Sequence, residues 1–393
     1  MFLNIVFGLL SILVLVGIGF LLSENKKAIQ WRPIILGILL QIVLLVFLIK
    51  VPIGIDILDS ISDGVDKVIS FGNSGLNFVF GKSLNTPEVF AISVLGIVCF
   101  VTALINVLYY LRIIPLFIKT VGRILAKIFG VSDAEMFCAV SNMFLGGSEA
   151  PMVVKPFLNK MTRSQLFCIT VGGFSSVSTG VLAGYVGMGI PLHYLLLGVA
   201  TVPFSTVVMA KLLVPETENV NKRVEIAYSD ENGLFEAISN GAITGMEIGL
   251  KVGAILIAVL GLVAFINYIL KFFNLSLTEI FGWILLPLAK LMHIPVAEQN
   301  TYASLIGLKI ATNEFVAFGQ LGKVLTTLSV RTQAMLVVAL VNFANLSVIG
   351  ITIGSMKVFV SERSKEISGF AFKSMIAGIL TTLITSAIIG MIY

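Results

Sequence analysis

Long apolar runs recur along almost the whole of this chain. Charged residues make up only 12% of its 393 residues, whereas soluble domains average about 25%. An α-helix needs about 20 mostly apolar residues to cross a hydrocarbon core about 30 Å thick. The sequence therefore predicts an all-α polytopic membrane protein in a lipid bilayer, with eight transmembrane helices at 2–22, 33–53, 89–111, 165–190, 194–214, 247–270, 333–356 and 370–392.

The remaining composition excludes several classes. The run 2–22 has no basic residue before it and no small-residue cleavage pattern after it, so we expect a retained span. Cys99, Cys138 and Cys168 form no C-x-x-C pair and predict neither a disulfide nor a metal site. The net charge of +5 comes from basic residues scattered through loops, which are orientation signals, so nucleic acid is not an expected partner.

Basic loops set the expected orientation. If eight spans alternate, the loops holding Lys26, Arg123 and Lys365 fall on one side, which should be the cytoplasm. Both termini of this cell-membrane protein are then predicted to lie outside. The segment 56–80 has apolar residues at helical spacing among aspartates, which predicts an interfacial amphipathic helix.

Two further apolar segments are interrupted. The segment 136–158 is broken at Gly146-Gly147, and 279–320 is broken at Thr312-Asn313. Non-helical backbone at membrane depth is tolerated only where it is buried in protein or lines a cavity. We therefore expect two re-entrant helical hairpins.

The order of elements repeats. Each hairpin is followed by a span with a polar cluster and then by a final span, and alternating topology makes the two copies inverted. Inverted repeats with broken helices are typical of secondary transporters. The expected parts are a scaffold and oligomerisation region (1–135), a first transport repeat (136–214), a linker with an interfacial helix and scaffold span (215–278), and a second transport repeat (279–393).

Each hairpin places one carboxylate, Glu149 or Glu314, in apolar surroundings, where an acid is costly unless it has a function. Hydroxyl and amide side chains accompany both acids, while neither cluster contains arginine. This set suits a neutral ligand with several O–H and N–H groups, such as a sugar or nucleoside. Asn142, Ser176 and the carbonyls freed at the Gly-Gly break suit a sodium ion, although a buried glutamate can also carry a proton.

Three runs of sequence carry a family resemblance: SNMFLGGSEAP at 141–151, TNEFV at 312–316 and NFANLSVIG at 342–350. They resemble the motifs of the concentrative nucleoside transporter family in its short bacterial form. The resemblance implies a homotrimer that imports nucleosides with a sodium or proton gradient by an elevator motion and needs no organic cofactor.

By position, the resemblance implies roles for individual residues. Asn142, Leu145, Ser176 and Val177 match sodium ligands, with Leu145 and Val177 acting through their carbonyls. The expected substrate-binding set is Gly147, Ser148 and Glu149 at the base, Glu314, Phe343 and Asn345 at the ribose, and Val181, Asn313 and Ser347 beside them.

Two departures from the family pattern matter. Gly147 stands where many members have glutamine, which is expected to open space beside the base and favours purine nucleosides. Val348 replaces a serine, so one ribose contact is missing or is made by Ser347 or water. Because Asn142 and Ser176 are both present, sodium is favoured over a proton; the alternative is a proton-coupled symporter with broad or pyrimidine preference.

Simpler readings stay open at this point. Glu149 and Glu314 are within reach in sequence of Lys155 and Lys309 as structural ion pairs. Asn142 can be a helix cap, and Ser178 and Thr179 can be small packing residues. An intramembrane hydrolase using the two glutamates lacks a nucleophile elbow, a metal triad or a histidine partner, and a nucleoside-gated channel is a further rival.

Overall fold

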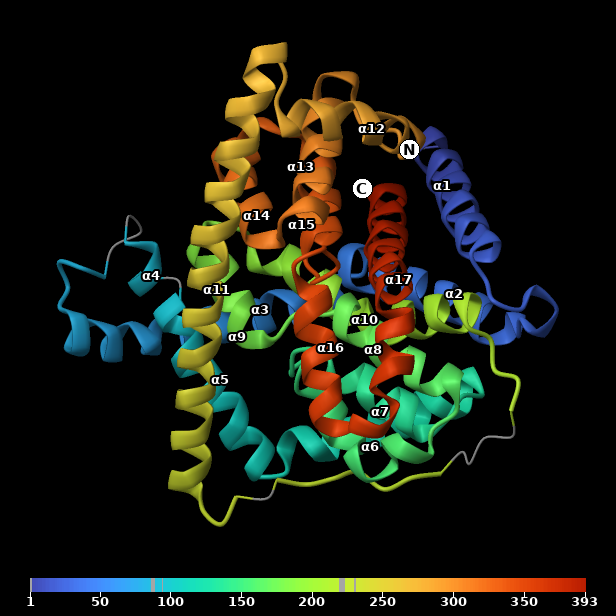
Figure 1. The fold of residues 1–393 in the computed structure, drawn as a ribbon, viewed down its shortest axis with the longest axis vertical. Coiled ribbons are helices and arrows are strands. Elements are labelled where there is room, and N and C mark those ends of the chain that lie inside the picture. The colour runs from blue at the N-terminus through green and yellow to red at the C-terminus, as the bar shows by residue number, and fades with distance from the viewer. Residues whose placement is uncertain (1, 86–88, 94, 219–222, 230) are drawn as a thin grey trace.

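The computed structural model describes residues 2–85, 89–93, 95–218, 223–229 and 231–393, and it is helical without strands over those ranges (Figure 1). Within them, six helices are long and apolar enough to cross a membrane, or seven if a bent pair counts as one span. They are α1 (Phe2–Leu21), α2 (Trp31–Lys50), α8 with α9 (Arg163–Ser175 and Thr179–Gly187), α10 (Leu192–Leu213), α11 (Leu234–Leu270) and α17 (Ser364–Ile392).

The prediction of eight simple spans is therefore wrong in two places, and the span expected at 165–190 is interrupted between α8 and α9. The span expected at 89–111 becomes the short α4 (Phe90–Ser93) and α5 (Leu95–Tyr110), and α5 is bent by 71° against α6 (Ile113–Phe129). Arg112, with a left-handed φ of 63°, lies at that bend. The span expected at 333–356 is two short helices, α15 (Val330–Leu340) and α16 (Val348–Phe359), separated by a polar stretch.

Both expected hairpin breaks are present, with different boundaries. In the first, α7 (Asp133–Ser141) is followed by the Gly-Gly segment and a 3-10 helix (Ala150–Lys160). In the second, α13 (Gln299–Ala311) and α14 (Glu314–Val324) flank Thr312-Asn313, while α12 (Leu277–Leu291) is a separate helix before the hairpin. The labels α7 and α13 lie at opposite ends of the molecule in Figure 1.

Local sequence explains where these helices begin. Ser132 and Glu135 form a reciprocal capping box at the start of α7. The side chain of Asn313 accepts a hydrogen bond from the Val316 amide at 3.0 Å and so starts α14. Short 3-10 helices occur at Lys26–Ala28, Lys271–Phe273, Val296–Glu298, Leu325–Thr327 and Ser361–Arg363.

The amphipathic segment is one helix, α3 (Pro52–Phe80), as expected from its pattern. Pro52 suits the first helical turn, and the helix stops at Gly81, whose φ of 82° disfavours other residues. It packs against α2, α5 and α10. Its position at the membrane interface stays a prediction.

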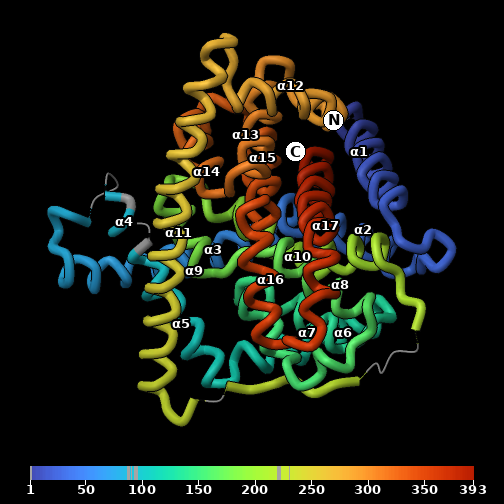
Figure 2. Tube along the Cα trace, in the orientation of Figure 1, coloured from blue at the N-terminus to red at the C-terminus, as the bar shows by residue number. Residues whose placement is uncertain are grey.

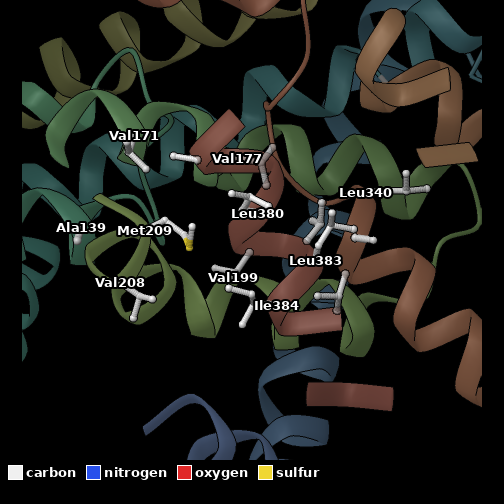
Figure 3. Packing of buried hydrophobic residues seen from close by; sticks show 14 of the residues in the cluster. Ala139, Val171, Val177, Val199, Val208, Met209, Leu340, Leu380, Leu383 and Ile384 are labelled. Atoms are coloured by element: carbon white, nitrogen blue, oxygen red, sulfur yellow. The ribbon is translucent and has the colours of Figure 1, made fainter. Parts of the chain in front are cut away.

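Burial separates inner from outer spans. The apolar windows of α8 with α9, α10 and α17 are 94%, 83% and 89% buried, whereas that of α11 is only 6% buried. Val171, Met209 and Ile384 belong to the core between the inner helices (Figure 3). Helix α11 runs along one side of the molecule (Figure 1), so its exposed apolar surface is available to lipid or to another subunit.

The two chain ends lie toward the same end of the molecule (Figure 2). Helix α1 packs against α17, and Gly8 of α1 faces Met391 and Ala387 near the end of α17. This agrees with termini on one side of the membrane, and the assignment of that side to the exterior stays a prediction.

Candidate functional site

A cavity of about 500 Å³ lies where the two hairpin breaks meet. Both predicted acids, Glu149 and Glu314, line it. Its volume falls in the usual range of about 300–1,000 Å³ for small-molecule pockets. The convergence of one acid from each half on a single cavity is therefore present in the structure.

Almost all of the residues predicted to bind substrate line this cavity. The exception is Asn345, which is fully buried behind the wall. Its amide nitrogen donates to the Glu314 carboxylate at 2.9 Å, and its amide oxygen accepts from the Ser347 hydroxyl at 2.6 Å. Asn345 thus positions two lining residues and does not itself line the cavity. The predicted residues on the wall are Gly147, Ser148, Glu149, Val181, Asn313, Glu314, Phe343 and Ser347.

Helix geometry holds Glu314 in place. It is the first residue of α14, directly after the capping residue Asn313. The amino end of a helix carries partial positive charge, which stabilises a nearby carboxylate. Together with the hydrogen bond from Asn345, this placement fixes the acid before any ligand arrives.

The first hairpin presents its acid from a tight turn. The Glu149 amide donates to the Gly146 carbonyl at 2.9 Å. A Cβ added to Gly147 would lie 2.2 Å from the Gly173 Cα, so the backbones are in close contact there. The expectation that the missing glutamine opens space beside the base is therefore not met in that direction, which Gly173 fills.

The structure also shows whether Glu149 and Glu314 form ion pairs with Lys155 and Lys309. Lys155 is exposed, and no ion pair joins Glu149 or Glu314 to a basic residue among the described parts of the chain. Lys309 instead donates to the Ala339 carbonyl at 2.9 Å and to the amide oxygen of Asn342. The alternative reading of two structural ion pairs is wrong.

The predicted ion-binding residues gather at the ends of two helices. Asn142 follows α7 and Ser176 follows α8, and the Ser176 hydroxyl donates to the Asn142 amide oxygen at 2.9 Å. Both side chains are buried. Leu145 and Val177 lie in the adjoining breaks, which are joined because the Phe144 carbonyl accepts from the Thr179 amide at 3.1 Å.

This donor set fits a small cation. Carboxyl ends of helices carry partial negative charge, and α7 and α8 both end here. No hydrogen bond reaches the carbonyl oxygens of Leu145 and Val177 from any described residue, so these oxygens remain able to act as ligands. Asn142 both caps α7 and offers an amide oxygen, so its two predicted roles are compatible.

The two halves touch directly at their breaks. The Phe343 amide donates to the Ser176 carbonyl at 3.3 Å. Phe343 lines the cavity, whereas Ser176 belongs to the predicted ion site. A single backbone hydrogen bond therefore links the cavity wall to the predicted ion site.

One wall of the cavity was absent from the predicted set. It comes from α11 and includes Ile248, Lys251 and Val252. Lys251 pairs with Glu247 one turn earlier at 3.0 Å. Two charges in an otherwise apolar span are a signal that could have identified this wall, since charged residues in spans are commonly functional. Thr352 and Ser355 of α16 add further polar groups.

Comparisons with known proteins cover nearly the whole chain. Residues 10–83 match the family model described as Na+ dependent nucleoside transporter N-terminus, 91–192 match one described as Nucleoside recognition, and 194–390 match Na+ dependent nucleoside transporter C-terminus.

Several proteins are similar over their full length. An uncharacterized transporter of Haemophilus influenzae is 38% identical, covering 99% of this chain and 98% of the relative. Nucleoside permease NupC of Helicobacter pylori is 36% identical, covering 98% and 97%. The solved structure of CNTnw in an inward-facing substrate-bound state is similar with a TM-score of 0.95 and 37% identity, covering 98% of both chains.

Proposed function

Because this chain belongs to the family of Na+-dependent concentrative nucleoside transporters, we propose that it imports nucleosides into the cell, driven by a sodium gradient. Family membership makes it a multi-pass membrane transporter and not an enzyme.

The observation that carries the proposal is the cavity shared by Glu149 and Glu314. Two carboxylates accept hydrogen bonds from hydroxyl and amine groups, and Ser148, Asn313 and Ser347 on the same wall add groups that donate and accept. A nucleoside offers this mixture, with the ribose hydroxyls directed to Glu314 and the base to Gly147, Ser148 and Glu149. Val181 and Phe343 give apolar contact to its rings.

Sodium is the proposed coupling ion. Asn142, Ser176 and the carbonyls of Leu145 and Val177 give only oxygen ligands, at two converging helix ends. Oxygen ligands suit a hard cation. The cation would neutralise charge on the side of the cavity that holds Glu149.

The proposed motion follows from burial. The well-buried α8, α10 and α17 would move with both hairpins as a transport domain, while the lipid-accessible α11 and the first region stay fixed. This corresponds to two inverted transport repeats, 136–214 and 279–393, against a scaffold formed by 1–135 and 215–278. The exposed scaffold is the proposed contact surface of a homotrimer with both termini outside.

Uptake into proteoliposomes tests the proposal. Radiolabelled uridine or inosine should accumulate above its external concentration under an inward sodium gradient, and replacement of sodium by choline at constant pH should abolish accumulation. Unchanged uptake in choline would indicate proton coupling. Equilibration without accumulation would indicate a channel, and recovery of free base plus ribose a hydrolase.

A competition assay tests base preference. The sequence-based reason for preferring purines was open space at Gly147, and Gly173 fills that direction. Inosine and guanosine are therefore compared with uridine and cytidine as competitors of one labelled nucleoside. Stronger inhibition by inosine and guanosine would support a purine preference, but its cause would then not be open space at Gly147.

A further inference from the structure

We propose that the ammonium group of Lys309 is a tethered cation, which occupies in the second half of the chain the position that the coupling sodium takes in the first half. The inference rests on the proposed function for the place of sodium at Asn142 and Ser176. Lys309 is only 2% exposed, and buried lysines are rare unless they are paired.

The surroundings of Lys309 match those of the proposed sodium site. In the first half, Asn142 at the end of the hairpin helix α7 meets Ser176 just after α8. In the second half, Lys309 in the last turn of the hairpin helix α13 meets Asn342 just after α15. Each half thus joins the end of a hairpin helix to the end of the broken span that follows.

An asparagine presents its oxygen at both places. The Asn142 nitrogen donates to the Cys138 carbonyl at 3.0 Å, which leaves its oxygen toward Ser176. The Asn342 nitrogen donates to the Gly378 carbonyl at 2.6 Å, which leaves its oxygen toward Lys309. Each amide is therefore anchored through its donor and offers an acceptor, as a cation requires.

Helix ends favour positive charge at both places. The carboxyl ends of α7 and α8 meet at Asn142, and those of α13 and α15 meet at Lys309. Such ends carry partial negative charge. The Lys309 ammonium donates to the Ala339 carbonyl in the last turn of α15, at 2.9 Å, which is the contact that a bound ion would make with a freed carbonyl.

Each half of the chain then holds one carboxylate of the cavity and one cation, without direct contact between the two charges. Glu149 faces the cavity in the half that would hold sodium, and Glu314 lies in the half that holds Lys309. The sodium ion dissociates in each transport cycle, whereas the Lys309 ammonium stays attached to the chain. A second sodium has no place while Lys309 is present, so transport should move about one sodium per nucleoside.

The variant Lys309→Ala tests this inference because it removes the tether and leaves the oxygens. We expect the charge moved per nucleoside, from reversal potentials in proteoliposomes, to rise from about one to about two, with a steeper sodium dependence of uptake. Sodium should also raise the melting temperature of the purified variant more than that of the wild type, relative to choline. Lys323→Ala, an exposed lysine of the same hairpin, should match the wild type in both measurements.

A wild-type charge ratio and sodium response in Lys309→Ala would overturn the inference. Failure to obtain the folded variant at any sodium concentration would overturn it as well, because an ion should replace the missing ammonium. The sodium dependence of the wild type tests the proposed function separately. Stabilisation of Lys309→Ala by sodium, with a wild type insensitive to sodium, would support the tethered cation and contradict sodium coupling.

Discussion

The two broken hairpins have the same plan but hold their acids differently. Glu314 begins a regular helix after the cap Asn313 and accepts a hydrogen bond from Asn345 at 2.9 Å. Glu149 lies in a glycine turn, and no described side chain donates to it within hydrogen-bond distance. The protein itself thus fixes the position of Glu314, whereas Glu149 remains available for hydrogen bonds from a bound ligand.

The strongest test of this difference removes each charge in turn. Glu149→Gln and Glu314→Gln should each lower kcat/KM for uptake by at least about tenfold, because a hydrogen bond to a charged group contributes about 1.5–3 kcal/mol. Uptake is measured in proteoliposomes at matched protein content. Glu279→Gln, at an exposed cap of α12, is the control, and wild-type uptake by either test variant would refute that acid's role.

The glycine turn allows a second comparison within the first hairpin. Gly147→Ala places a Cβ 2.2 Å from the Gly173 backbone, so the turn must move, and uptake should fall about tenfold through overpacking of about 1–3 kcal/mol. Gly146→Ala places a Cβ 3.1 Å from the Ser178 Cβ and at ordinary contact distance from the Ser178 backbone, and its effect should stay within about threefold. Equal effects of the two substitutions on uptake would show that close packing at Gly147 is unimportant.

The ion site allows a smaller, more selective test. Asn142→Ala removes an oxygen from the proposed sodium site, and the sodium concentration for half-maximal uptake should rise about fivefold, as expected for the loss of about 1 kcal/mol. Sodium is varied against choline at constant ionic strength. Asn240→Ala, at an exposed position of α11, should leave the curve unchanged; an unchanged curve in Asn142→Ala would remove this residue from the site.

The smallest expected effect concerns an anchor shared by both halves. Glu24, between α1 and α2, pairs with Arg163 at the start of α8 and with Lys373 of α17, both at 3.0 Å. The hydrogen bond from Arg163 is the main cause that lowers the pKa of Glu24 from 4.5. Its contribution to stability is therefore present above pH 4.5 and is lost as the pH falls through the lowered pKa.

Glu24→Gln should accordingly lower stability by less than about 1 kcal/mol at pH 7, as for other partly exposed ion pairs. The melting temperatures of wild type and variant should converge below pH 4.5, the ordinary value for this group. A difference that persists unchanged in acid would assign the effect to packing of the side chain and not to its charge.

The sequence predicted the continuous spans and the chemistry of the hairpins better than the interruptions within other helices. Apolar length alone located α1, α2, α10 and α17, because a buried or lipid-facing helix needs little else. Averaged hydropathy did not show the interruption between α15 and α16, since flanking valines and leucines mask the polar residues. The bend at Arg112 depends on a left-handed backbone that composition does not encode.

Motifs located most of the cavity wall but not its full geometry. Glu149 and Glu314 were found because acids in apolar segments are costly, and both line the cavity. Asn345 was predicted to bind the ribose, and in the structure it lies behind the cavity wall and donates to Glu314; its position depends on which way the broken segment turns. Lys251 was missed because the hairpin motifs alone defined the expected site, although the charges of Glu247 and Lys251 in an apolar span were a signal for this wall.

The junction between Phe343 and Ser176 has a consequence for energetic efficiency. A backbone hydrogen bond of 3.3 Å joins the segment that would bind the nucleoside to the segment that would bind the sodium ion. A transporter in which this hydrogen bond is weakened should transport sodium without nucleoside. The cell would then lose part of its sodium gradient without taking up substrate. The strength of this junction would then influence how strictly one nucleoside is transported together with one sodium ion.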